Sequence, residues 1–310
     1  MSILREHGTA YLAMRRSLGY KLEDHGRLLM KFIGYLEDHG HGTVTTEAAM
    51  SWAAAPAGVT QAYQSRRLSV ARCFARYLFA FDPACQVPPP GMTGPSQPRP
   101  VPYLYSREDI SALIHASGTL ASPLQAATFQ ALISLLAVTG MRPGEAVMLD
   151  VGDVDLGASL VTVHGKYDRT RLVPLHPGTV AMLRRYRERC RHLRPAPASP
   201  AFFLSAAGTR LTGSRLDAVF AQLLALAGIT SRGNRPARVH GLRHSFAVAT
   251  LTDWYRDGAN VAAQMPLLSA FMGHAGPAST FYYLHAAPEL PGLAAQRLHD
   301  HQQQAGKEEP

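Results

Sequence analysis

The chain has 310 residues, with 31 Lys and Arg against 22 Asp and Glu, so its formal charge is +9. With 46% hydrophobic and 17% charged residues, the composition is typical of a folded protein, and the length allows two domains. No apolar run reaches the roughly 18 residues of a membrane span, the N-terminus lacks a signal-peptide core, and three scattered cysteines argue against a disulfide framework. We therefore expect a cytoplasmic protein.

The positive charge is concentrated in two stretches. Residues 160–245 hold 15 Arg and Lys but only three acids, which gives this stretch a net charge of +12. A second stretch, 61–81, has no acid and contains Arg66, Arg67, Arg72 and Arg76. Concentrated positive charge is typical of nucleic-acid binding, although either stretch alone could be a solvated helix face and Arg-rich codon usage could supply part of the surplus.

The first 82 residues read as a small helical domain. Apolar residues repeat at helical spacing from Leu22 to Leu36, Thr45 or Thr46 can cap a short helix that ends before Pro56, and Thr60 opens a basic helix with an apolar face. This pattern predicts a four-helix module. Residues 83–105 are expected to form a linker, because eight of the 22 prolines lie between 83 and 102.

The rest of the chain, 106–287, reads as a mostly helical domain with one small antiparallel sheet. Ser106 and Asp109 form a capping-box pattern, and a long apolar helix follows over 123–139. Short strands over 159–164 and 171–175 flank a turn at 165–170, and helices resume at Pro177, with a second capping box predicted at Ser214 and Asp217.

Four short segments carry the chemistry: TGMRPGEA (139–146), HGKYDRTRLVPL (164–175), HGLRHSFA (240–247) and MGHAGPASTFYYLHA (272–286). Each is weak alone, since an Arg after a Thr-Gly break or a Lys in a turn is commonly a surface residue. His240 and His244, four apart on a helix, could also be two metal ligands, but no Cys or carboxylate completes such a site.

Together and in this order, the segments resemble the tyrosine recombinase (phage-type integrase) family, in a bacterial mobile-element subgroup. The resemblance implies a SAM-like, helical core-binding domain followed by a catalytic domain. It also implies six catalytic residues, which are Arg142, Lys166, His240, Arg243, His274 and the nucleophile Tyr283. Tyr282 is adjacent, but the spacing from His274 and the His two residues downstream favour Tyr283.

Phosphoryl transfer explains why these residue types belong together. In-line attack builds negative charge on the non-bridging phosphate oxygens, which Arg142 and Arg243 would clamp while His274 adds a hydrogen bond. Tyrosine titrates near ~10, so Tyr283 needs a base, and His240 is the natural one. Lys166 could protonate the departing 5′ oxygen. The residues expected to contact DNA are Arg66, Arg67, Arg76, Arg169, Arg171, Arg232, Arg235 and Arg238.

The resemblance implies further properties of the protein. It implies a site-specific DNA recombinase that works through a 3′-phosphotyrosyl intermediate in integration or excision, with no metal or other cofactor and with association with the nucleoid. The expected partners are double-stranded recombination sites, a homodimer on one site and a homotetramer in the synapse, and accessory DNA-bending proteins or sister recombinases. Residues 288–310 resemble a tail that docks on a neighbouring subunit, or else a terminus packed on its own domain.

The sequence differs from the common pattern of the family at one point, and two alternative functions remain open. Thirty residues separate Arg243 from His274, more than is common in the family, so Asp253–Arg256 should extend a helix or loop. Glu145 matches a position that supports the first arginine. These alternatives are a type IB topoisomerase-like enzyme, which reseals the strand that it cuts, and a catalytically inactive DNA-binding regulator.

Overall fold

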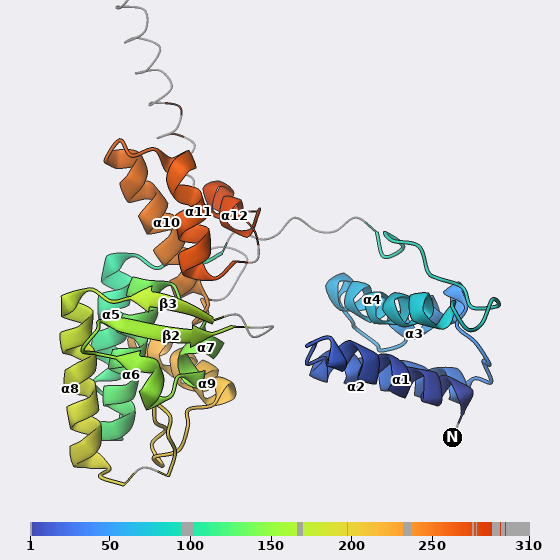
Figure 1. The fold of residues 1–310 in the computed structure, drawn as a ribbon, viewed down its shortest axis with the longest axis horizontal. Coiled ribbons are helices and arrows are strands. Elements are labelled where there is room, and N and C mark those ends of the chain that lie inside the picture. The colour runs from blue at the N-terminus through green and yellow to red at the C-terminus, as the bar shows by residue number, and fades with distance from the viewer. Residues whose placement is uncertain are drawn as a thin grey trace, which may run out of the picture. The chain divides into compact units, whose positions relative to one another are not determined.

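The structure, a computed structural model (Figure 1), describes residues 2–94, 102–165, 170–196, 198–231, 237–274, 276, 278–286, 292 and 295. The chain divides into two compact units, Met1–Arg99 and Pro100–Pro310. The fold is mainly helical with a small antiparallel sheet, which confirms the predicted fold class. Among the described residues, no helix is both long and apolar enough to span a bilayer.

The first unit contains the four predicted helices, and three of them begin at a side-chain cap. The hydroxyls of Ser2, Thr45 and Thr60 accept hydrogen bonds from backbone N–H groups in the first turn of their helices. Apolar side chains from all four helices form one core, which includes Phe32, Trp52 and Phe74. The helices are α1 (Ile3–Ser17), α2 (Glu23–Asp38), α3 (Thr46–Ala54) and α4 (Gln61–Leu78).

The start of the proline-rich stretch packs on this first unit. Cys85 lies in its core, and Arg72 of α4 donates hydrogen bonds to the carbonyls of Pro88 (2.7 Å) and Pro89 (2.8 Å). At the other end, Tyr103 and Tyr105 are buried in the second unit. The expected linker at 83–105 is therefore too long at both ends, because proline prevents helix formation but leaves the carbonyls free to accept hydrogen bonds.

The second unit is built around a buried helix. The core helix α6 packs against its neighbours α5, α8 and α10, and most of its side chains are buried. Its partner α5 begins at the predicted capping box of Ser106 and Asp109. The first helices of this unit are α5 (Arg107–Ser117), α6 (Pro123–Thr139) and α7 (Pro143–Met148).

A three-stranded antiparallel sheet with the order β1-β2-β3 follows (Figure 1). After the 3-10 turn η1 (Val151–Asp153), its strands are β1 (Val154–Asp155), β2 (Leu160–His164) and β3 (Thr170–Pro174). β1 is too short to give a sequence signal. The predicted strand start at Ser159 is one residue early, because Ser159 has a φ of 58°, outside the β region.

The remaining helices complete the unit, and α10, α11 and α12 gather at one end of it (Figure 1). Asp253–Arg256 lie within α10, so of the two expected alternatives, a helix or a loop, these four residues form a helix. The predicted capping box at Ser214 is wrong, since the hydroxyl of Thr212 caps α9 instead. These helices are α8 (Pro177–Leu193), α9 (Gly213–Leu226), α10 (Gly241–Arg256), α11 (Val261–Met272) and α12 (Ala278–Ala286).

Candidate active site

Arg142 lies in a sharp turn between two helices. Gly140 ends α6 with a φ of 59°, and a Cβ there would lie 2.3 Å from Phe246, so both conformation and space require glycine. Pro143 then occupies the first turn of α7. At the third position of α7, Glu145 reaches back to accept a hydrogen bond from the Arg142 backbone N–H (3.1 Å).

Glu145 holds two arginine side chains. Its Oε1 accepts from Arg142 Nη1 (2.7 Å), and its Oε2 accepts from Nη2 of Arg171 (2.6 Å) on β3. Burial alone would raise the pKa of the Glu145 carboxyl, but the hydrogen bonds and charge of Arg171, together with the hydrogen bonds from Arg142, lower it below its usual value. Glu145 is therefore ionised at neutral pH.

The C-terminal turn of α11 collects three arginines from three different elements. The last carbonyls of a helix lack partners within it and carry partial negative charge, so cations there are favourable. Three consecutive carbonyls accept one guanidinium hydrogen bond each. The pairs are Arg171 Nε to Phe271 (3.0 Å), Arg243 Nη2 to Met272 (2.8 Å) and Arg142 Nη2 to Gly273 (2.9 Å).

Arg243 is the most deeply placed of the three, with 2% of its surface exposed. Its Nη1 also donates to the carbonyl of Gly140 (2.7 Å), so it ties the end of α6 to the end of α11. Burial and the nearby charge of Arg142 lower the pKa of Arg243 to about 10, which still leaves it a cation at neutral pH.

Two predicted histidines lie in this positive surrounding and are neutral at pH 7. Partial desolvation, followed by the charges of Arg243 and Arg142, lowers the pKa of His240 at the start of α10. The same causes lower the pKa of His274 to about 4. Its Nδ1 lies 2.7 Å from the hydroxyl of Thr280, an arrangement that fixes the ring. A neutral imidazole offers one donor and one acceptor nitrogen.

Tyr283 of α12 is buried against these groups, with 3% of its surface exposed. Its ring centroid lies 6.0 Å from that of His274. Burial raises the pKa of Tyr283, although the nearby positive charge of Arg243 opposes this. Tyr283 therefore lies within the group of residues that the sequence predicts to be catalytic.

The expected DNA contacts fall into three groups. Arg66, Arg76 and Arg238 are exposed, so their guanidinium groups can reach the phosphates of bound DNA. Arg67 is buried and does not suit such a contact, because it stacks on Trp52 (3.9 Å to the ring centroid) and donates to the Trp52 carbonyl. Arg171 is turned into the site. Four predicted residues lie outside the described residues, namely Lys166, Arg169, Arg232 and Arg235. Most of the tail over 288–310 also lies outside them.

Three residues that lie close to the predicted catalytic residues have no predicted role in catalysis. The sequence predicts Arg171 to contact DNA, and it gives no signal for Thr280. The ring of His244 lies 5.0 Å from that of His240 and 5.4 Å from that of Tyr283. The four-residue spacing of the two histidines on a helix was the available signal, since it places them on one face.

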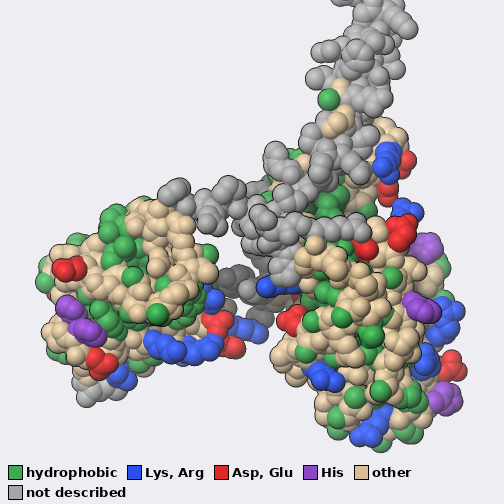
Figure 2. All heavy atoms as spheres, turned by 180° about the vertical axis from the view of Figure 1, so that it is seen from behind, with side chains coloured by type: hydrophobic (Ala, Val, Ile, Leu, Met, Phe, Trp, Pro, Cys, Tyr) green, Lys and Arg blue, Asp and Glu red, His purple; other side chains and the backbone are tan. Residues whose placement is uncertain are grey.

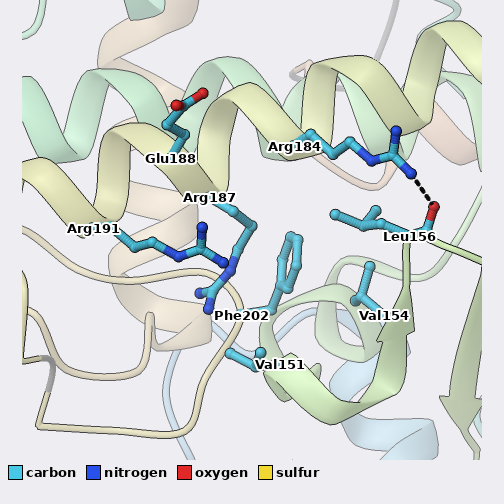
Figure 3. Close-up of a pocket in the computed structure, with 8 residues that line it drawn as sticks. All are labelled: Val151, Val154, Leu156, Arg184, Arg187, Glu188, Arg191 and Phe202. Carbon is cyan, nitrogen blue, oxygen red and sulfur yellow. Dashed lines mark hydrogen bonds between the residues drawn. The ribbon is translucent and has the colours of Figure 1, made fainter.

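A separate hollow of about 410 Å³ lies beside β1, at the sheet edge opposite β3 (Figure 3). Phe202 and Val154 line it, together with Arg184, Arg187 and Arg191 of α8. Arg184 donates to the Leu156 carbonyl (2.8 Å), and Arg187 lies 5.5 Å from the Phe202 ring. Lys and Arg side chains also gather on the side of this unit where α8 lies (Figure 2). None of the described residues that line the hollow is a tyrosine or a histidine, so the candidate chemistry remains at the end of α11.

Comparisons with known proteins agree with this geometry. The family model described as the phage integrase family matches residues 104–289. A chain of Sinorhizobium fredii named as an integrase/recombinase, y4rB, is 39% identical over 310 residues, which cover 96% of this chain and 98% of that one. The tyrosine recombinase XerD of Rhizobium meliloti is 31% identical over 252 residues, or 78% of this chain and 74% of that one.

Solved structures share the fold at low sequence identity. XerH bound to a palindromic difH substrate has a TM-score of 0.67 at 20% identity and covers 87% of this chain and 78% of its own. The Tn1549 transposon integrase in complex with transposon right-end DNA has a TM-score of 0.68 at 16% identity, with coverage of 94% and 99%. From the family model and these relatives, the chain belongs to the phage integrase family of tyrosine recombinases.

Proposed function

We propose that the protein is a site-specific DNA recombinase in which Tyr283 attacks a scissile phosphate. The phenol oxygen forms a new bond to phosphorus, and the bond from phosphorus to the 5′ oxygen breaks. A 3′-phosphotyrosyl linkage and a free 5′-hydroxyl result. A 5′-hydroxyl from a second strand then attacks the linkage, so strands are rejoined without an external energy source. Integration or excision of a mobile element is the proposed setting.

One observation carries this proposal: a buried tyrosine lies against a cation that is itself held on the end of a helix. The positive charge of Arg243 acts on the Tyr283 phenol, and Arg243 is anchored on the Met272 carbonyl (2.8 Å). Arg142 is anchored one residue further along, at Gly273. Two guanidinium groups fixed side by side suit the two non-bridging oxygens of a phosphodiester, whose negative charge grows during attack.

The histidines and the hairpin lysine are proposed to move the protons. Burial raises the pKa of Tyr283, so its proton needs an acceptor, and the lowered pKa of His240 leaves that imidazole free to take it. His274, also neutral, would donate a hydrogen bond to the phosphate. Lys166 would protonate the departing 5′ oxygen. The arginines supply the charge that metal ions supply in other phosphoryl-transfer enzymes.

The proposed partners are two double-stranded DNA sites. The exposed residues Arg66, Arg76 and Arg238 are proposed to contact phosphates, together with Arg169, Arg232 and Arg235. Phosphate contacts of this kind make binding strongly salt-dependent. We also propose a dimer on one site and a tetramer at synapsis, with the tail over 288–310 docking on a neighbouring subunit. Mass measurement on DNA, with and without the tail, tests this assembly.

A nicked suicide substrate tests the chemistry. The DNA should come from the ends of the genetic element that encodes the protein, because base readout cannot be designed from phosphate contacts. We expect wild-type protein to form a covalent adduct that survives denaturing electrophoresis, in the presence of a metal chelator. Tyr283→Phe should form none, and Tyr282→Phe, the matched control, should form it.

Three results would change the conclusion. An adduct that persists in Tyr283→Phe but disappears in Tyr282→Phe would move the nucleophile by one residue. Relaxation of supercoiled DNA without paired sites and without recombinants would favour the topoisomerase-like alternative. Specific DNA binding without any adduct would favour an inactive regulator.

A further inference from the structure

Arg171 lies on β3, and the sequence places it among the DNA contacts. We propose that Arg171 is a positioning residue for the phosphate clamp: by sharing the Glu145 carboxylate, it leaves Arg142 with uncompensated positive charge and a fixed direction. This inference rests on the proposed function, because the clamp matters only if a phosphate is bound there. It assigns Arg171 a partner inside the protein in place of DNA.

Exposure separates the two arginines that share Glu145. The side chain of Arg171 is 15% exposed and that of Glu145 is 9% exposed, whereas that of Arg142 is 40% exposed. Arg142 is thus the member of the trio that a phosphate can reach. Arg171 is the member that faces the protein, from a strand that lies next to α11 (Figure 1).

Each oxygen of Glu145 has two donors, so the carboxylate is fully engaged. Oε1 accepts from Nη1 of Arg142 (2.7 Å) and Nη1 of Arg171 (3.2 Å). Oε2 accepts from Nη2 of Arg171 (2.6 Å) and the backbone N–H of Arg142 (3.1 Å). Because the Arg171 contact is bidentate, it sets the plane of the carboxylate, and the carboxylate in turn sets the Arg142 guanidinium.

The charges of the trio give a second reason. Arg142 and Glu145 alone would form a neutral pair, which has little attraction for a phosphodiester. Arg171 adds a second cation to the same anion, so the trio carries a net positive charge where Arg142 is exposed. The burial of Glu145 strengthens this effect, because charges interact more strongly away from water.

Arg171 also contacts the C-terminal turn of α11, whose carbonyls bind Arg142 and Arg243. Its Nε donates to the Phe271 carbonyl, and its guanidinium lies against Gly273, where a Cβ would be 2.6 Å from Nη1. Gly273 supplies the carbonyl that holds Arg142. Loss of Arg171 would therefore loosen both supports of Arg142, the carboxylate and the helix end.

The test compares a charged with an uncharged scissile phosphate. A methylphosphonate replaces one non-bridging oxygen by a methyl group, so it lacks the charge that the clamp neutralises. We expect Arg171→Gln to slow adduct formation by about 10- to 100-fold on the phosphodiester, the range that misplacement of a positioned group produces. The reduction in the rate of adduct formation that Arg171→Gln causes should be about tenfold smaller on the methylphosphonate than on the phosphodiester. The same should hold for Arg142→Gln. Arg107→Gln, which removes an exposed arginine of α5, is the charge-matched control and should match wild type on both substrates.

The outcomes separate positioning from stability. An equal loss on both substrates, or no loss on the phosphodiester, overturns the proposal. If the melting temperature of Arg171→Gln shows that it does not fold, Arg171→Lys replaces it in the same comparison. Lysine keeps the positive charge but lacks the planar guanidinium that binds both carboxylate oxygens. Arg171→Lys should therefore slow adduct formation less, and more on the phosphodiester than on the methylphosphonate. A wild-type chain that forms no adduct contradicts the proposed function instead, and with it the clamp.

Discussion

Acid should destabilise the second unit, which we call the catalytic unit, because His274 becomes protonated. Replacement of His274 should make the melting temperature of this unit less sensitive to acid. The folded pKa of His274 is about 4, because of desolvation and the charges of Arg243 and Arg142, whereas an unfolded histidine titrates near ~6.5. The folded state therefore binds its proton later than the unfolded state as the pH falls. The stabilisation is fully present above pH ~6.5 and is lost progressively as the pH falls toward 4.

The magnitude follows from these two pKa values. Between pH 7.5 and pH 5 the linkage relation gives about 2 kcal/mol, and since the ring is only half-buried we halve this for solvent screening to about 1 kcal/mol. For a unit of this size that corresponds to a fall in melting temperature of about 2–4 °C.

Calorimetry of the DNA-free chain at pH 7.5 and pH 5 measures this effect. The melting temperature of the catalytic unit should fall less in His274→Gln than in wild type, by about that amount. The exposed His192 of α8 provides the control, and His192→Gln should follow wild type. Equal slopes for wild type and His274→Gln would refute the reasoning, because they would mean that this imidazole titrates normally in the folded chain.

Two further predictions concern the two units separately. Arg67→Met should lower the melting temperature of the first unit by about 10 °C, because it loses the Trp52 stack and a buried hydrogen bond. The control Arg76→Met should leave the melting temperature unchanged and weaken DNA binding. An unchanged melting temperature in Arg67→Met would contradict the role assigned to that side chain. Gly273→Ala should reduce adduct formation about tenfold, because Gly273 has a φ of +67° and the new Cβ would meet the guanidinium of Arg171. DNA binding, measured by gel shift, should persist. Unchanged adduct formation would show that the turn tolerates a side chain.

The elements that could be predicted from sequence are those with local signals. The capping pair Ser106 and Asp109 indicates the start of α5, Gly140 indicates the end of α6, and the alternating Val161 and Val163 indicate the strand β2. Ser214 wrongly predicts the cap of α9, because the hydroxyl of Thr212, two residues earlier, suits the same role. The backbone conformation places only the Thr212 hydroxyl at the start of the helix. Such choices depend on how the chain enters the helix.

Four of the predicted catalytic residues come together in the structure, but their connections could not be predicted from sequence. Arg142, Arg243, His274 and Tyr283 meet as expected, since each stands in a recognisable motif. The role of Arg171 was not predictable, because an arginine on a short basic strand gives the same pattern whether it faces DNA or a buried carboxylate. Its direction is set by contacts with residues 26 and 100 positions away in the chain.

The turn at the end of α11 also sets when the protein can become active. The three guanidinium groups come from residues made early, at positions 142, 171 and 243, but the carbonyls that hold them come from positions 271–273. A nascent chain on the ribosome, or a fragment cut before this turn, would thus carry the arginines without their anchors and without Tyr283. DNA strand cleavage would become possible only once residues 271–283 have been synthesised, which would protect the genome from copies of the enzyme that stop before them.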